Sequence, residues 1–487
     1  MNTLFLNSST GRRVALLAVA GVLASLAFAS VASAASPPGT ACVSSDGKIS
    51  ARGATFQTLA QQNAFIPGYT FDVCGVVSSQ GANDPSPTGM VAYNYPASTG
   101  GGGGTGSGQG QKAVSCRSDA FGGSDKPYDK ATLASLKGAA GALGGCSPLG
   151  TGGFLPPYTP NVAPFPDAGD ASNVNMMSFP VAGSSVAIGV NLSVAQDGAG
   201  CDASNLQWQV SDLSKIYGGL VTNWNQLPGL AGCDKPITRI VRLDSSGTTQ
   251  TFKNGLARAD GATALCDGNT WSAFTPDAAN TNWPTTGACP ANLVRPGVNG
   301  GQALVQLVST TDASIGYADL ADWLNFASTV PLATLRNQAN TAFQGPANGQ
   351  AANCQWTGAV LPGIAKTNAD AVGLNANADQ TWAFDSTANG GRGYANVTFT
   401  GTTYPLCGFT WDMVYTGLSA ASPGGAVSRL TNDQRATLWS YFTYLMSPAA
   451  QARLGAPATT PGGGQPGYVA IPTAWLRQIR LGFQAAF

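Results

Sequence analysis

The chain turns from a predicted strand into a predicted helix at Arg242-Leu243-Asp244-Ser245-Ser246-Gly247-Thr248-Thr249. The strand is expected over 237–242 and the helix over 248–259, with a loop rich in small hydroxyl residues between them. Such a turn presents backbone N–H groups that have no partner inside the helix, together with the positive end of the helix dipole. This combination suits an oxyanion, and Arg242 adds a permanent positive charge beside it.

Three other stretches share this design, namely Gly53-Ala54-Thr55-Phe56, Gly106-Ser107-Gly108 and Phe121-Gly122-Gly123-Ser124-Asp125. Taken singly, each is better explained as an ordinary helix cap or turn, because Ser, Thr and Asp cap helices in most proteins. The glycine run over 100–110 also fits a flexible linker. It is not a Walker A loop, since no Ser or Thr follows Lys112 to hold magnesium.

After residue 34, where a predicted leader ends, the mature chain alternates β-like apolar runs with segments of helical period. This alternation predicts an α/β protein. A buried strand is expected over 181–191, and Thr431 and Gln434 form a capping-box pattern at the start of a helix. Segments 260–286 and 337–393 are rich in Ala, Asn, Gly and Thr and are expected to be surface insertions. The mature length of about 450 residues exceeds what one core usually supports, so two lobes are expected.

Residues 1–34 are a predicted signal peptide. Arg12-Arg13 precedes an apolar run over 14–29, and Ala32-Ser33-Ala34 is a small-x-small cleavage pattern. The apolar run is shorter than the roughly 20 residues that span a bilayer, which disfavours a retained anchor. The first mature cysteine, Cys42, is not preceded by a lipid-attachment pattern. We therefore expect a periplasmic or secreted protein without membrane insertion.

The ten cysteines all lie in the mature chain, and none has Cys-x-x-Cys spacing. In an exported chain, an even number predicts about five disulfides rather than zinc ligands. The sequence does not fix the pairing. If cysteines pair with their neighbours along the chain, each bond closes one local excursion, and the pairs are 42–74, 116–146, 201–233, 266–289 and 354–407.

All 24 acidic residues are aspartates, and the chain has neither glutamate nor histidine. Without histidine, no Ser-His-Asp or Cys-His nucleophile and no His-ligated metal site can be assembled. We therefore expect no catalytic residue, no metal and no cofactor. Without its leader the chain has a net charge near −2, so it lacks the basic surface that a nucleic-acid partner requires.

The order of these motifs resembles the substrate-binding protein of high-affinity phosphate ABC importers, a type 2 periplasmic binding protein family. The resemblance covers nearly the whole mature chain, and the stretch that begins at Arg242 is its most specific part. The other matching stretches are 51–56, the Gly-Ser turn at 106–108, 121–125, 220–225, 299–301, 314–317, 404–411 and 467–472.

The resemblance implies a type 2 periplasmic binding protein fold, with two α/β lobes joined by two crossing strands and with disulfide-stapled insertions. Lobe one would combine residues 42–183 and 405–487, and lobe two would contain residues 184–404. The protein would be a monomer that closes on inorganic phosphate between the lobes. An ABC permease could then recognise the closed form.

The resemblance also implies the phosphate ligands. Arg242 would present its guanidinium fork to two phosphate oxygens, held by Asp244 unless that residue is only a helix cap. Asp125 would discriminate, because an ionised carboxylate only accepts hydrogen bonds and needs a ligand oxygen that carries a proton. Hydrogen phosphate has such an oxygen and sulfate does not. The remaining donors would be hydroxyl or backbone groups of Thr55, Phe56, Ser107, Ser246, Gly247 and Thr248.

Some positions depart from the family pattern. Arg52 and Ser245 stand where the family has glycine, so Arg52 could face solvent or ligand. The long glycine run leaves three other hydroxyl residues as alternatives to Ser107: Ser98, Thr99 and Thr105.

Two other functions stay open. One is a phosphatase, which the absence of histidine and of an activated serine disfavours. The other is a secreted relative with a matrix, adhesion or phosphate-scavenging role and no transporter, since fold does not fix function.

Overall fold

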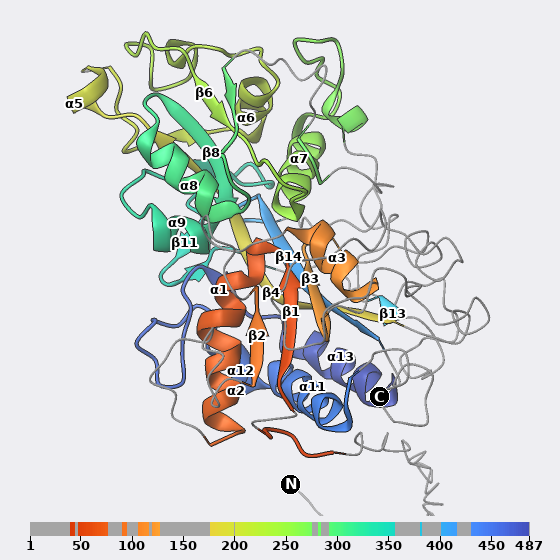
Figure 1. Cartoon of the computed structure of the whole chain (residues 1–487). Coiled ribbons are helices and arrows are strands. Elements are labelled where there is room, and N and C mark those ends of the chain that lie inside the picture. Colours follow the sequence, from red (N-terminus) through yellow and green to blue (C-terminus); the bar gives the residue numbers. More distant parts are fainter. Residues whose placement is uncertain are drawn as a thin grey trace, which may run out of the picture. The chain divides into compact units, whose positions relative to one another are not determined.

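The computed structural model (Figure 1) divides the chain into two compact units, Met1–Ser33 and Ala34–Phe487. Every residue that the structure describes lies in the second unit. No helix among these residues is both long and apolar enough to cross a bilayer. The described residues are 39–43, 47–75, 90–94, 106–115, 119–126, 176–198, 200–274, 281–283, 292–355, 380–381, 401–415 and 430–486.

One mixed sheet organises the second unit. Its strands are β1 (Ile49–Gly53), β2 (Val91–Tyr93), β3 (Phe121–Ser124), β4 (Met176–Asn191), β6 (Thr238–Ile240), β7 (Leu293–Val294), β8 (Ser314–Asp319), β13 (Gln380–Thr381), β14 (Cys407–Tyr415) and β15 (Tyr468–Val469). The order is β2-β1-β3-β14-β4-β8-β6-β7, and β13 and β15 also pair with β4. Strands β1 to β3 are parallel to one another, and so are β6 to β8.

Strand β4 connects the two halves of this sheet. It pairs antiparallel with β14 over Met176–Ser185 and antiparallel with β8 over Val186–Asn191. All its residues before Asn191 are buried, which explains why its sequence is apolar or small on both faces. Figure 1 shows β4 and β14 side by side where they pass between the halves. The predicted strand over 181–191 is therefore confirmed, although it begins five residues earlier.

The helices lie at the ends and on the faces of these strands. The first helical run joins η1 (Thr55–Gln57), α1 (Thr58–Ala60), η2 (Gln61–Phe65) and α2 (Ile66–Asp72). The helix predicted over 248–259 is confirmed as α7 (Gly247–Asp260). Other helices are α3 (Ser107–Ser115), α6 (Val210–Tyr217), α8 (Gly301–Thr310), α9 (Leu320–Phe326), α11 (Asn432–Leu445), α12 (Pro448–Gln451) and α13 (Thr473–Ala486).

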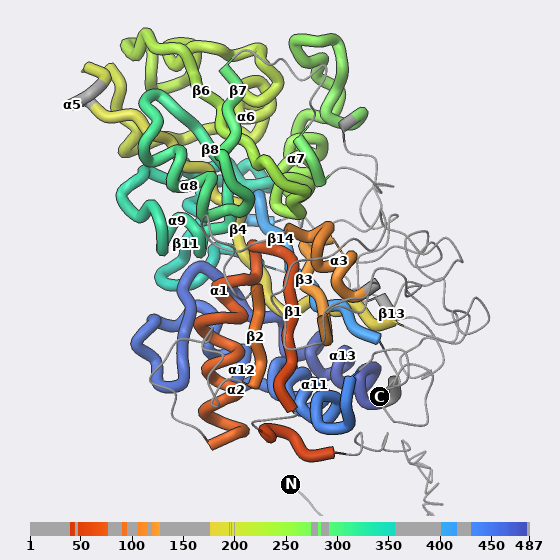
Figure 2. The backbone as a smooth tube through the Cα atoms, viewed as in Figure 1, coloured from red at the N-terminus to blue at the C-terminus, as the bar shows by residue number. Residues whose placement is uncertain are grey.

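The end of the chain returns to its beginning. Figure 2 shows α11 beside β1 and α2, and α11 contacts both of these elements. Gln434 Nε2 donates to the Lys48 carbonyl at 2.9 Å. The capping box is confirmed, because Gln434 N donates to Thr431 Oγ1 and Thr431 N donates to Gln434 Oε1. The mixed sheet with two long shared strands confirms the predicted fold class, and the lobe boundaries stay a prediction.

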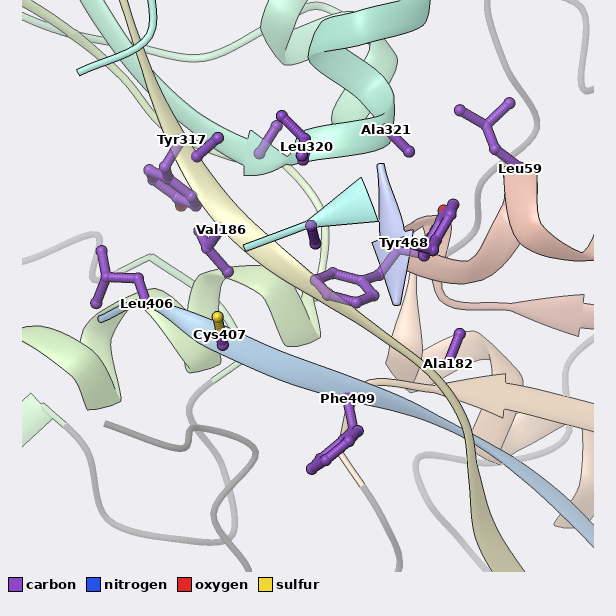
Figure 3. Packing of buried hydrophobic residues seen from close by; sticks show 14 of the residues in the cluster. Leu59, Ala182, Val186, Tyr317, Leu320, Ala321, Leu406, Cys407, Phe409 and Tyr468 are labelled. Atoms are coloured by element: carbon purple, nitrogen blue, oxygen red, sulfur yellow. Dashed lines mark hydrogen bonds between the residues drawn. The ribbon is translucent and has the colours of Figure 1, made fainter. Parts of the chain in front are cut away.

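The hydrophobic core follows β4 through both halves of the sheet. Figure 3 shows buried side chains from both halves, among them Val186, Tyr317 and Tyr468, gathered around this strand. The expectation that 260–286 is a surface insertion is wrong for two tryptophans. Trp271 and Trp283 are buried, because their rings pack against each other and Trp283 also packs against Tyr317.

Three of the predicted disulfides are confirmed, namely Cys42–Cys74, Cys201–Cys233 and Cys354–Cys407. Cys266 is also disulfide-bonded. Cys116, Cys146 and Cys289 lie outside the described residues, so the other two pairs stay predictions.

Candidate functional site

Three helix starts and one strand end lie together in the structure, because Ala54 N donates to the Gly123 carbonyl at 2.9 Å and the Ser107 hydroxyl bonds to both Asp125 N and Gly247 N. The helix starts are those of η1, α3 and α7, and the strand end is that of β3, which Asp125 follows. Gly106 (φ +77°) leads into α3, and a Cβ atom on it would lie 2.4 Å from the Ser245 carbonyl oxygen. Only glycine lets these two loops approach so closely, because an L residue would strain the backbone and clash. Segments more than a hundred residues apart thus share one site.

Ser107 links three of these segments through its hydroxyl group. Its Oγ accepts from Asp125 N at 2.9 Å and from Gly247 N at 3.2 Å, and it donates to Asp125 Oδ2 at 3.4 Å. All three residues are buried. The alternatives to Ser107 named from the sequence, Ser98, Thr99 and Thr105, lie outside the described residues.

Gly247 fits between Ser107 and Asp125 because it has no side chain. A Cβ atom at this position would lie 2.3 Å from Asp125 Cβ and 2.6 Å from Ser107 Oγ. The start of α7 therefore lies directly against Asp125, the residue that follows β3.

Arg242 and Asp244 form a two-point ion pair. Arg242 Nε donates to Asp244 Oδ1 at 2.7 Å, and Arg242 Nη2 donates to Asp244 Oδ2 at 2.5 Å. Asp244 Oδ1 also accepts from Gly300 N at 3.3 Å. Burial alone would lower the pKa of Arg242, but the charge and hydrogen bonds of Asp244 outweigh it, so this pKa is raised. The guanidinium is thus held in one orientation and stays charged.

Asp125 is almost completely buried, with 1% of its surface exposed. The pKa of its carboxyl is raised to about 7, mainly by burial and to a smaller extent by the charge of Asp244. Hydrogen bonds from Thr410 and Ser107 and the charge of Arg242 oppose this rise. Near neutral pH the group can therefore exist as an acceptor-only carboxylate or as a carboxylic acid that donates.

The hydroxyl residues at the start of α7 have different surroundings. Ser246 Oγ caps the helix by accepting from Thr249 N at 3.2 Å. Thr249 Oγ1 lies 2.8 Å from the Tyr317 hydroxyl. Thr248 Oγ1 is buried and has no hydrogen-bond partner within the described residues. An orphaned buried hydroxyl points to a group that the structure does not hold.

Thr55 and Phe56 begin the helical run that follows β1. Both are buried, and no side chain caps this helix start. The Phe56 carbonyl accepts from the Tyr468 hydroxyl at 2.5 Å, so β15 fixes the turn from the other end of the chain. The free N–H groups of a helix start are the feature that suits an anion.

Sequence reasoning left Arg52 open and missed two acidic residues. Arg52 Nε pairs with Asp119 Oδ2 at 2.5 Å. Asp319 and Asp322 are buried beside Gly301, at the start of α8, and no local pattern in the sequence marks them. No cluster of three or more metal-ligating side chains occurs among the described residues.

The chain is similar to solved structures along most of its length, and each comparison covers 89% of this chain and 93% of the other. One is a human phosphate binding apolipoprotein, at 20% identity and a TM-score of 0.52. Another is an ancestral soluble variant of the human phosphate binding protein, at 18% and 0.51. A third is a phosphate-binding protein from Stenotrophomonas maltophilia, at 17% and 0.50. These likenesses bear on the fold, since such low identities do not carry function.

No curated protein sequence matches the chain. A family model described as the PBP superfamily domain matches residues 93–427, which is more than half of the sequence. The chain therefore belongs to the PBP superfamily.

Proposed function

We propose that this chain is an exported solute-binding protein that binds inorganic phosphate and does no chemistry on it. The observation that carries the proposal is the meeting of the helix starts at Thr55, Ser107 and Gly247 with buried Arg242 and buried Asp125. Helix starts and a fixed guanidinium favour an anion. The similar solved structures are named as phosphate-binding proteins, which agrees with this anion.

Each candidate residue has a role in this proposal. Arg242, held by Asp244, donates to two phosphate oxygens. Thr248 supplies its unpartnered hydroxyl group. The remaining donors are the hydroxyl or backbone groups of Thr55, Phe56, Ser107, Ser246 and Gly247. Of these, Ser107 Oγ, Gly247 N and Ser246 Oγ already hold hydrogen bonds within the protein. To bind phosphate, Gly247 N must therefore donate its hydrogen to a ligand oxygen in place of Ser107 Oγ, or share it between these two acceptors.

Asp125 provides the selectivity. When it is ionised it accepts a hydrogen bond from the hydroxyl group of hydrogen phosphate, and it repels sulfate, which has no proton to offer at neutral pH. When it is protonated, this discrimination weakens. Selectivity for phosphate over sulfate should therefore grow as pH rises through about 7, where Asp125 loses its proton.

The proposal also excludes catalysis. The chain has no histidine and no glutamate to act as base or acid. Ser107, which lies at the centre of the site, has no histidine beside it to take its proton and make it a nucleophile, because the chain contains none.

We further propose that residues 1–34 direct export and that the closed, phosphate-bound monomer delivers its ligand to an ABC permease. The mature N-terminus of the exported protein, read by mass spectrometry, checks the cleavage after Ala34. Loss of phosphate uptake in cells that lack the gene, restored by the wild-type chain, checks transport.

Titration calorimetry on protein stripped of bound ligand tests the binding itself. Phosphate should bind tightly, sulfate weakly, and arsenate serves as the third ligand because it has the same shape and also carries a proton. The variant Arg242→Lys keeps the charge but loses the planar fork, so it should bind phosphate more weakly. If phosphate produces no heat at several temperatures, the proposed function is wrong.

A further inference from the structure

A pair of buried acidic side chains lies behind the site. Asp319 ends β8 and is the N-cap residue of α9, and Asp322 follows in the first turn of α9. Asp319 is 1% exposed and Asp322 is 3% exposed. The Oδ2 atom of each has no hydrogen-bond partner within the part of the chain that the structure describes. Two ionised carboxylates in such a place would be costly, so the pair needs a neutralising group.

Both side chains reach the same point of the backbone. A Cβ atom on Gly301 would lie 1.8 Å from Asp322 Oδ2 and 3.5 Å from Asp319 Oδ1. Because both distances are measured from one point, Asp322 Oδ2 and Asp319 Oδ1 lie close to each other. If one carboxyl group carries a proton it can donate to the other, whereas two ionised carboxylates would only repel each other.

This pair is connected to the phosphate-binding residues. Gly300, next to Gly301, donates its N–H to Asp244 Oδ1 at 3.3 Å, and Asp244 in turn holds Arg242. The pair therefore contacts the backbone segment that completes the hydrogen bonding of Asp244.

The charged and titratable groups that face the pair come from three further elements. Asp125 follows β3, Arg242 and Asp244 follow β6, and the Tyr468 phenol comes from β15. Among these groups in the described residues, Arg242 is the single cation. Four ionised carboxylates and a bound phosphate would carry far more charge than one guanidinium, so protons on the carboxyl groups would lower the cost of binding the anion.

We propose that Asp319 and Asp322 are positioning residues that share a proton, and that phosphate capture is linked to the protonation of this pair. The inference rests on the proposed phosphate binding. Burial and the nearby second carboxyl raise the pKa of Asp319 well above its usual range, and burial raises that of Asp322 to about 6.

The sign of the linkage follows from charge. A bound anion favours the protonated pair, so phosphate affinity is highest where the pair holds its protons. It falls as pH rises and the pair ionises. Calorimetry in two buffers of different ionisation enthalpy should show that the protein takes up protons on binding phosphate.

The variant Asp322→Asn tests this linkage. Its neutral amide can still donate to Asp319, so it imitates the singly protonated pair and removes the like charge. We expect phosphate binding at neutral pH within a few fold of wild type and a flatter dependence of log Kd on pH between about 6 and 9. The slope difference approaches about tenfold per pH unit if a full proton is involved.

Asp312→Asn is the matched control, because that carboxylate is exposed and pairs with Lys235 at 3.0 Å. It should keep the wild-type slope. Titration of phosphate itself affects every variant alike and cancels in the comparison. If Asp322→Asn melts at too low a temperature to be measured, Asp319→Asn takes its place with the same expectation.

The outcomes separate the two proposals. A wild-type protein that does not bind phosphate overturns the proposed function and this inference with it. The inference alone is overturned if the wild-type protein binds phosphate but Asp322→Asn, or Asp319→Asn in its place, shows the same pH slope of log Kd and the same proton uptake as the wild type. Affinity reduced by an equal factor at every pH would show a merely structural role and would also overturn it.

Discussion

Replacing Asp125 by Asn should convert the site from phosphate-selective to nearly unselective. At pH 8.5 the wild-type carboxyl is ionised, since its pKa is about 7. It accepts from hydrogen phosphate, but it meets a sulfate oxygen with nothing to donate. The amide of the Asp125→Asn variant would instead offer an N–H to sulfate, while the hydrogen bond to phosphate would lose its charge.

The magnitude follows from the burial of Asp125, which is 1% exposed. Leaving one partner of a buried charged hydrogen bond unpaired costs about 2–5 kcal/mol. At about 1.4 kcal/mol per tenfold change, the wild-type ratio of sulfate Kd to phosphate Kd should exceed that of Asp125→Asn by roughly 30-fold to several thousandfold.

Calorimetric titrations with both anions at pH 8.5 and pH 5.5 measure this ratio. In the wild-type protein sulfate should bind better at pH 5.5, because a protonated Asp125 can donate to it. In the Asp125→Asn variant the amide at position 125 does not titrate, so the Kd for sulfate should lose the pH dependence that Asp125 causes. A ratio that is the same in variant and wild type at pH 8.5 would refute the role of Asp125, provided that Asp312→Asn also leaves the ratio unchanged.

The other predictions concern single contacts. Gly247→Ala should weaken phosphate binding by at least about tenfold, because its Cβ would lie 2.3 Å from Asp125 Cβ; calorimetry that finds an unchanged Kd contradicts the close approach. Thr248→Val should weaken binding by about 2- to 13-fold, the worth of one ordinary hydrogen bond, and should leave the ligand-free melting temperature unchanged or higher, since it removes an unpartnered buried hydroxyl. A lower ligand-free melting temperature would show that this hydroxyl is bonded. Thr431→Ala removes the cap of α11 and should lower the free energy of unfolding by about 1 kcal/mol in denaturant titrations, with unchanged phosphate affinity.

Local patterns in the sequence predict the elements well. The capping box at Thr431 and the helix after Gly247 need only short-range chemistry, and both form as expected. The strand that ends at Asn191 begins earlier than predicted, because Met176–Pro180 is covered by β14 and needs no alternation of polar and apolar residues.

The assembly of the site could not be worked out from local patterns. Nothing near Ser107 shows that its hydroxyl accepts from Gly247, because that contact depends on how β3 and β6 are placed in one sheet. The family resemblance is what groups these residues into one predicted site. No local pattern marks the pair Asp319 and Asp322, because its significance depends on Gly301, a residue of another helix. Composition alone mispredicts Trp271 and Trp283, because small polar residues dominate the sequence around them.

Strand β4 changes its partner from β14 to β8 between Ser185 and Val186. Because one continuous backbone carries both sets of ladder bonds, the loops at Ser107 and Gly247 can separate only if the chain near this point bends or twists. Cys407, which pairs with Ser185, is tied to Cys354 by a disulfide. The rates of phosphate binding and release should therefore depend on a few residues that lie far from the ligand. Substitutions at these residues should change the exchange rates without changing the contacts to the anion.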